Sequence, residues 1–179
     1  MKKLAILTSL ALLLAAASAF AQLGATTGTT TLSVGVVAEA GLTVNTATTT
    51  LASSGTNFST YTGTTNLTYY IRTTPTTGAG SIVLKVTTDF APAGGPSVTT
   101  PPTAGDKLTY NCTVSSPGTA CTGPLTASTA STTNVGSFVA GSKSTYAGNT
   151  ASVAWSLTND PQYTVGTYTA TVTFTISAT

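Results

Sequence analysis

Two stretches of the chain alternate between apolar and polar residues, and this alternation constrains the fold more than any other feature. Over residues 168–178, apolar side chains occupy every second position, and threonine or serine fills the positions between them. A similar run covers residues 32–44, with Val37 as its exception, and Gly41 could divide that run into two strands. Since successive side chains of a β-strand point to opposite faces, this period predicts strands with one buried face.

Composition extends this prediction to the rest of the chain. The 179 residues include 44 threonines and 18 serines, and nothing after the N-terminal segment has the periodicity of an amphipathic helix. Threonine and valine are stiff at χ1 and favour strands. Clusters of glycine, proline, asparagine and serine interrupt the chain at short intervals, so we predict an all-β sandwich or barrel. Further strands are expected near residues 67–71, 82–86, 107–114, 134–139 and 151–157, with loops at 91–105 and 126–133.

The first 21 residues have the pattern of a secretory signal peptide. A basic start precedes an apolar run at residues 4–14, and small residues ending in Ala21 supply a cleavage site. We predict cleavage before Gln22. The alternative is a retained N-terminal anchor, for which the apolar run is short.

Export would change the charge balance. Removing Lys2 and Lys3 leaves four cationic and four acidic side chains, so the net charge falls from +2 to zero. Nucleic-acid binding needs clustered cations, and docking on anionic lipid needs a basic patch. We therefore expect neither nucleic acid nor a membrane as a partner of the mature protein.

Catalytic chemistry is restricted because the chain has no histidine and only four carboxylates. A serine nucleophile would then need a lysine base, and no S-x-x-K motif occurs. Asp89 and Asp106 flank the loop at 91–105 and could approach each other as a glycosidase pair, although solvated turn acids are the favoured interpretation. We predict that the protein is not an enzyme and that it holds no cofactor and no metal.

The two cysteines, Cys112 and Cys121, lie nine positions apart in a chain predicted to be exported. Disulfides persist in oxidising compartments, so we predict a disulfide between them, with two free thiols as the alternative. Closing so short a loop typically stabilises a protein by about 2–3 kcal/mol. A metal site is disfavoured because no histidine and no third cysteine are present.

Trp155 and Lys85 each admit two interpretations. The only tryptophan shares a strand face with Val153, and we expect it to anchor the core rather than to serve as a ligand platform. Lys85 lies in mid-strand, where it could form an isopeptide crosslink to an asparagine, as in some surface pilins. The favoured interpretation is an outward-facing lysine that discourages edge pairing.

The two ends of the chain resemble a known family. The segment TTTLSVGVVAEAGLTVN resembles the start of spore coat protein U-like domains, the archaic chaperone–usher pilin subunits, and YTVGTYTATVTFTIS resembles their closing strand. That family usually places a cysteine near the position of Ala40–Leu42, where this chain has none. The resemblance implies an immunoglobulin-like β-sandwich, here over residues 39–179.

The same resemblance implies a mode of assembly. Such subunits are incomplete sandwiches, and the N-terminal segment of one copy, here residues 22–38, adds as a strand to the next copy. The alternative is that this segment is an ordinary first strand of its own sandwich. The implied partners are copies of the chain itself, a periplasmic chaperone and an outer-membrane usher. The implied donor residues are Leu32, Val34, Val36 and Ala38, and the implied acceptor-groove residues are Val172, Phe174 and Ile176.

The sequence thus favours a secreted or cell-surface structural subunit of a filament or coat. The alternative function is a secreted β-sandwich module that binds carbohydrate or a surface protein through aromatic side chains; a secreted hydrolase is the least favoured. The tyrosines that could offer stacking surfaces are Tyr61, Tyr69, Tyr70, Tyr110, Tyr146 and Tyr163.

Overall fold

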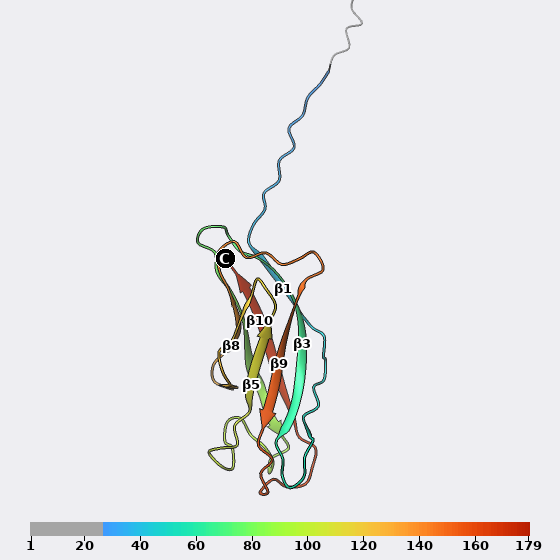
Figure 1. Cartoon of the computed structure of the whole chain (residues 1–179), viewed down its shortest axis with the longest axis vertical. Helices are drawn as coiled ribbons and strands as arrows, with labels where there is room; N and C mark the ends of the chain where they lie inside the picture. Colours follow the sequence, from blue (N-terminus) through green and yellow to red (C-terminus); the bar gives the residue numbers. More distant parts are fainter. Residues whose placement is uncertain (1–26) are drawn as a thin grey trace, which may run out of the picture. The chain divides into compact units, whose positions relative to one another are not determined.

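The computed structural model describes residues 27–179, so the predicted signal peptide at 1–21 lies outside the described residues. The chain separates into two units, one ending at Gly35 and the other comprising Val36–Thr179, and each is described by itself. Residues 27–35 belong to no strand or helix, and the second unit holds the strands (Figure 1). The strands are β1 (Glu39–Val44), β2 (Ala52–Ser53), β3 (Tyr61–Arg72), β4 (Gly80–Ala91), β5 (Thr109–Val114), β6 (Thr119–Ala120), β7 (Leu125–Thr126), β8 (Thr133–Phe138), β9 (Asn149–Leu157) and β10 (Thr169–Ala178).

These strands form two antiparallel sheets that pack together as a sandwich. The first sheet has the order β1-β3-β9-β5-β7, and β2 also pairs with β3. The second sheet has the order β10-β4-β8-β6. Residues 27–179 contain no helix, so the prediction of an all-β fold is confirmed.

The core lies between the sheets and follows the alternation of the long strands. Every second residue of the central strands is buried, as expected when one face of each sheet packs inward. One aromatic pair joins the two sheets, Tyr69 of β3 with Phe138 of β8, at a centroid separation of 5.1 Å. A second pair, Tyr110 with Trp155 at 5.5 Å, packs neighbouring strands β5 and β9 of the first sheet. The buried residues of the three long central strands are Thr65, Leu67, Tyr69 and Ile71 of β3, Ile82, Leu84 and Val86 of β4, and Ala151, Val153, Trp155 and Leu157 of β9.

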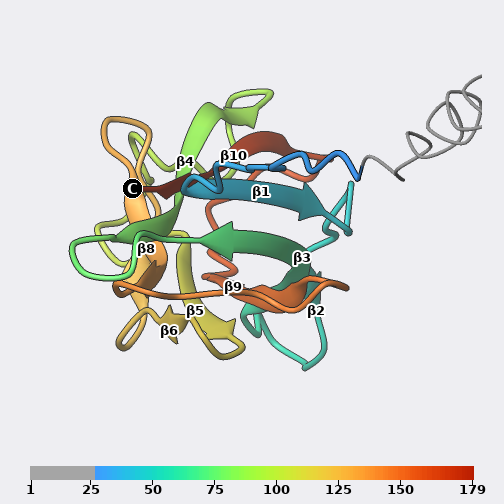
Figure 2. The same ribbon diagram turned by 90° about the horizontal axis from the view of Figure 1, so that it is seen from above.

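The two sides of the sandwich differ. On one side, Cys112 of β5 in the first sheet forms a disulfide with Cys121, which follows β6 of the second sheet, so the predicted disulfide is confirmed. On the other side, the edge strands β1 and β10 lie side by side without pairing to each other (Figure 2). One side is therefore covalently closed, and the other has no covalent link between its edge strands.

The N-terminal alternating run behaves differently from the expectation. The first strand begins at Glu39 rather than near Leu32, and Gly41 lies within β1, opposite Tyr70, instead of dividing two strands. Glu39 pairs with Arg72, the last residue of β3, so the residues before Glu39 find no further strand residue of β3 to pair with. Alternation alone does not form a strand without a neighbour.

Strand register defines two ends of the sandwich, which we name by what they carry. At the arm end, Glu39 pairs with Arg72, and the carbonyl of Thr179 accepts a hydrogen bond from the Thr74 amide. At the groove end, β3 begins and β9 finishes, with Tyr61 paired to Leu157. β1 therefore runs from the arm end toward the middle, and β10 runs from the groove end to the arm end.

Candidate functional site

Strand β10 is an edge with one free side. It pairs with β4 only, so its other row of backbone N–H and C=O groups has no strand partner within residues 27–179. Its inward-facing residues are only half-buried, whereas those of β9, which lies between β3 and β5, are buried. The inward-facing residues of β10 are Ala170, Val172, Phe174, Ile176 and Ala178.

An open groove of about 880 Å³ lies beside the first half of β10. It forms because the chain stops pairing regularly with β3 after Val44: the Asn45 amide still bonds to Asn66, but residues 46–51 form no strand. The half of β10 near the arm end is covered by β1, and the half near the groove end is left open. The apolar side chains that line the groove are Val44, Leu51, Phe58, Tyr61, Phe90, Leu108, Trp155, Leu157, Tyr163, Val165, Tyr168, Val172 and Phe174.

Side-chain hydrogen bonds hold Trp155 in the floor of the groove. The indole N–H of Trp155 donates to the Thr65 hydroxyl at 2.8 Å, and that hydroxyl shares a second hydrogen bond of 2.6 Å with Thr49. Trp155 is 5 % exposed, as expected for a core anchor. Its polar atom is satisfied from inside the domain, so the floor presents a mainly apolar surface.

The loop that follows β4 borders the groove, where Pro96 is a lining residue. A Cβ atom at Gly95 would overlap the ring of Tyr168, so any larger residue there would require that ring to move. Asp89 holds the same loop. Partial burial raises the pKa of its carboxyl, but hydrogen bonds from the Val98, Thr99 and Phe90 amides and the Ser97 hydroxyl outweigh burial and lower the pKa to about 2.

Two carboxylates that are distant in sequence meet at the groove end. Asp106 is buried beside Asp160, and burial, reinforced by the neighbouring carboxylate, raises the pKa of Asp106. The Gln162 amide and the Thr103 hydroxyl donate to Asp160 at 2.7 and 2.9 Å and lower its pKa. Asp160 is therefore the more readily ionised of the two carboxyl groups.

Tyr163 lies next to this carboxyl pair. Burial, and then the charges of Asp106, Asp160 and Tyr61, raise the pKa of Tyr163 to about 12. The disfavoured alternative, in which Asp89 and Asp106 approach each other, is not observed as an interaction: Asp89 accepts hydrogen bonds from its own loop, and Asp106 interacts with Asp160.

The N-terminal arm, which we define as residues 27–38, belongs to no strand. Its alternating apolar side chains are open to solvent, with exposed fractions of 91, 86 and 65 % for Leu32, Val34 and Val36; Ala38 is half-buried. Ten large hydrophobic side chains of the described residues are exposed, and seven belong either to the arm or to the groove. They are Leu32, Val34, Val36 and Val37 of the arm, and Val44, Phe58 and Val165 of the groove.

The three implied acceptor residues lie on one face of β10, but they differ in position. Val172 and Phe174 line the groove. Ile176 lies nearer the arm end, where it packs against the core, and it is not part of the lining. Sequence reasoning did not identify the other residues that line the groove. Most of them belong to the segment after β1 and to the loop before β10, where the sequence has no periodic pattern that could indicate a buried face.

The remaining candidates are Lys85 and the tyrosines that were considered as stacking surfaces. Lys85 lies on the outer face of β4, between the buried residues Leu84 and Val86, and no carboxylate is within ion-pair distance among residues 27–179. Of the tyrosines considered as stacking surfaces, Tyr69 and Tyr110 are fully buried, and only Tyr70 and Tyr146 are exposed.

Within the part of the chain that the structure describes, no three histidine, cysteine or acidic side chains gather in a way that could hold a metal ion. No helix of the described residues has the length and apolarity to span a membrane. Comparison with known proteins gives no match, whether to family models, to curated proteins or to solved structures.

Proposed function

We propose that the protein is a secreted structural subunit of a surface filament or coat. The N-terminal arm of one copy adds as a strand to the free edge of β10 in the next copy. One observation carries the proposal: an unpaired edge beside an apolar groove and an unpaired, alternating apolar arm occur in the same chain. The role needs no catalytic group, and we propose no enzymatic activity.

The chemistry of the two parts is complementary. An added strand would pair its backbone with β10 and place every second side chain in the groove, which is how β-augmentation obtains affinity and specificity. In the arm, Leu32, Val34 and Val36 occupy such alternate positions, and Val172 and Phe174 are the groove residues that they would contact in the next copy. Burying each large apolar side chain contributes about 1.5–3 kcal/mol.

The position of the arm's attachment favours an occupant from another copy. The arm joins β1 at the arm end, where the guanidinium Nε of Arg72 donates to the carbonyl of Val37, whereas the groove lies toward the opposite end. Near the arm end, β1 already fills the space beside β10. A neighbour's arm that enters from the groove end would run antiparallel to β10, and this head-to-tail contact would repeat without closing, which produces a filament.

The resemblance to spore coat protein U-like pilin subunits at both ends of the chain supports this proposal, and it adds a periplasmic chaperone and an outer-membrane usher as proposed partners. The disulfide is consistent with folding in an oxidising compartment. We therefore propose that the protein acts at the cell surface or outside the cell.

Charge substitutions in the arm test the proposal. Polymers of purified chain would be detected as a ladder in mild detergent that collapses on boiling, because an inserted strand is kinetically trapped. Val34→Asp should abolish the ladder, and so should deletion of residues 22–38. Ser33→Asp, which places the same charge on the other face of the arm, should retain it.

Strand β10, which would accept the arm, offers an equivalent test substitution and control substitution. Val172→Asp places a charge in the groove and should block polymer formation, whereas Thr173→Asp, on the outer face of β10, should not. Circular dichroism would establish that both variants fold. A ladder that persists in Val34→Asp or in the arm deletion would show that the arm does not join the copies and would overturn the proposed function.

A further inference from the structure

The few charges of the described chain are sorted between its two ends. The arm end carries two cations and one carboxylate, and the groove end carries one cation and three carboxylates. These are Arg72, Lys143 and Glu39 at the arm end, and Lys107, Asp89, Asp106 and Asp160 at the groove end. Counted as ionised side chains, the arm end carries +1 and the groove end −2, and Lys85, within β4, is the only charged side chain of 27–179 that belongs to neither end.

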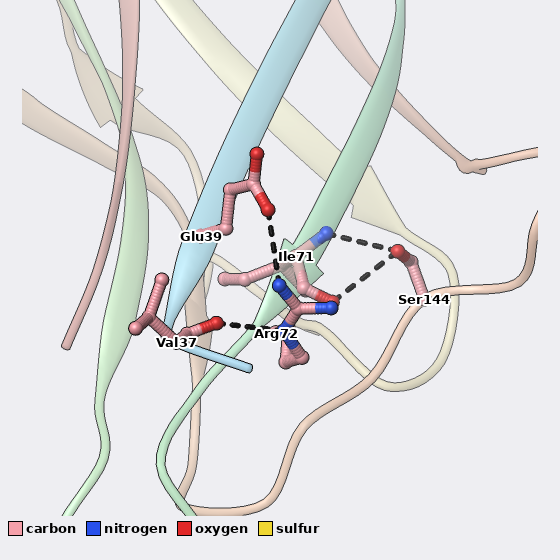
Figure 3. Close-up of polar contacts among 5 residues, drawn as sticks. All are labelled: Val37, Glu39, Ile71, Arg72 and Ser144. Carbon is pink, nitrogen blue, oxygen red and sulfur yellow. Dashed lines mark hydrogen bonds and ion pairs between the residues drawn. The ribbon is translucent and has the colours of Figure 1, made fainter. Parts of the chain in front are cut away.

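At the arm end, the charges surround the root of the arm. The guanidinium of Arg72 donates to the Val37 carbonyl at 2.7 Å and forms an ion pair of 3.0 Å with Glu39, as Figure 3 shows. Lys143 lies next to Arg72 through a backbone bridge. Its side chain is exposed and has no carboxylate within ion-pair distance among the described residues. Arg72 is thus neutralised locally, and Lys143 carries the positive charge that remains.

At the groove end, the negative charge lies at the mouth of the groove. Asp160 is itself a lining residue, and no cation lies within ion-pair distance of Asp160 or Asp106 among residues 27–179. Two amide or hydroxyl donors fix the Asp160 carboxylate in place. Among the described residues, the arm end therefore presents one cation outside an ion pair, Lys143, and the groove presents the Asp160 carboxylate among its lining residues.

We infer that the two ends are complementary contact surfaces for a second copy of this chain, with Lys143 of the incoming copy facing Asp160 of the copy that receives the arm. The inference rests on the proposed function. It adds that charge complementarity determines the head-to-tail direction in which copies join and the rate at which they do so. Two like ends would repel each other, whereas opposite ends would attract, and such complementary charge acts mainly on the association rate and on the choice of partner.

Charge reversal in the full chain tests this contact. Lys143→Glu alone, or Asp160→Lys alone, should slow polymerisation about three- to tenfold, because like charges then meet at the junction. The double variant restores an opposite pair and should recover the wild-type rate. Lys85→Glu, which makes the same charge change away from both ends, is the matched control and should leave the rate unchanged.

Two further measurements do not depend on how Asp160→Lys folds. Lys107→Glu adds negative charge at an exposed position of the groove end, so it should accelerate polymerisation of the wild-type arm. Raising the salt concentration from about 0.05 to 0.5 M should slow the wild type, because screening shortens the reach of surface charges.

The outcomes separate this inference from the proposed function. Suppose that polymers form only when the arm is present, but that their rate of formation does not change with salt, with Lys143→Glu or with Lys107→Glu. This result would overturn the inference and leave the proposed function standing. Failure of the double variant to recover, with a normal circular dichroism spectrum, would overturn it too. Loss of arm dependence itself would instead overturn the proposed function.

Discussion

Strands β9 and β10 have similar sequence patterns and different surroundings. Both alternate between apolar and polar residues, but β9 lies between β3 and β5, and β10 has a neighbour on one side only. The inward-facing residues of β9 are fully buried, and those of β10 are half-buried. The difference shows that alternation specifies which face of a strand turns inward, whereas the number of neighbours decides how much of that face leaves water.

Truncating one aromatic residue on each strand gives the largest expected contrast. Trp155→Ala should destabilise the domain by about 3–5 kcal/mol, as expected for a buried aromatic side chain. Phe174→Ala should cost less, about 1–2 kcal/mol, because the Phe174 side chain is only partly buried and its removal exposes less apolar surface to water. Urea unfolding, with a slope that stays constant between variants, measures both free energies.

These measurements require a monomer, so both substitutions belong in the Val34→Asp background. Equal costs for Trp155→Ala and Phe174→Ala would contradict the comparison, since they would mean that β10 is as well covered as β9. In assembled wild-type chain, the cost of Phe174→Ala should rise, because a donated strand would complete its burial.

The disulfide sharpens the contrast between the closed and the open side of the sandwich. Replacing Cys112 and Cys121 together by serine should lower the free energy of unfolding by about 2–3 kcal/mol, because the unfolded chain regains the entropy of a short loop. Polymer formation should survive in any variant that remains folded, because the crosslink joins β5 to the segment after β6, away from β1 and β10. Abolished polymerisation in a folded serine variant would show that the two sides are coupled.

The smallest expected effect is a pH dependence at the loop after β4, which borders the groove. The pKa of Asp89 is about 2 in the folded protein and near 3.8 otherwise, so its contribution is present above about pH 4 and is lost as the pH falls toward 2. Because this carboxylate is partly exposed, the contribution should amount to about 1 kcal/mol at most.

Unfolding free energies of the wild type and Asp89→Asn, measured between pH 7 and pH 2, test this dependence. The difference between them should shrink below about pH 4. Asp106 acts with the opposite sign, since its raised pKa makes protonation stabilising, but it is present in both proteins and cancels. A difference that stays constant across the whole range would contradict the assignment of the Asp89 carboxylate as the anchor of this loop.

Much of the architecture could be predicted from local patterns. The alternation around Leu67, Ile82 and Val153 located central strands, the proline- and glycine-rich stretch at 91–105 is a loop, and the cysteine spacing predicted the disulfide. These features depend on residues close together in the chain. The short strands β2, β6 and β7 were not expected, because two residues carry no detectable period.

The candidate site was less accessible to sequence reasoning. Val172 and Phe174 were identified from the alternation and the resemblance, but the carboxyl pair of Asp106 and Asp160 was not, because two loops far apart in the chain bring it together. The bond from Trp155 to Thr65 also joins residues that lie 90 positions apart. Nothing in a local pattern specifies such a contact.

The sequence by itself determined the class of fold, the face that each long strand turns inward, the disulfide and the scarcity of charge. Only the tertiary structure decided where the first strand begins, which half of β10 stays uncovered and which charges gather at each end. The physical reason is that side-chain alternation is a property of one strand, whereas burial, pairing and the proximity of charges depend on neighbours that the chain supplies from distant positions.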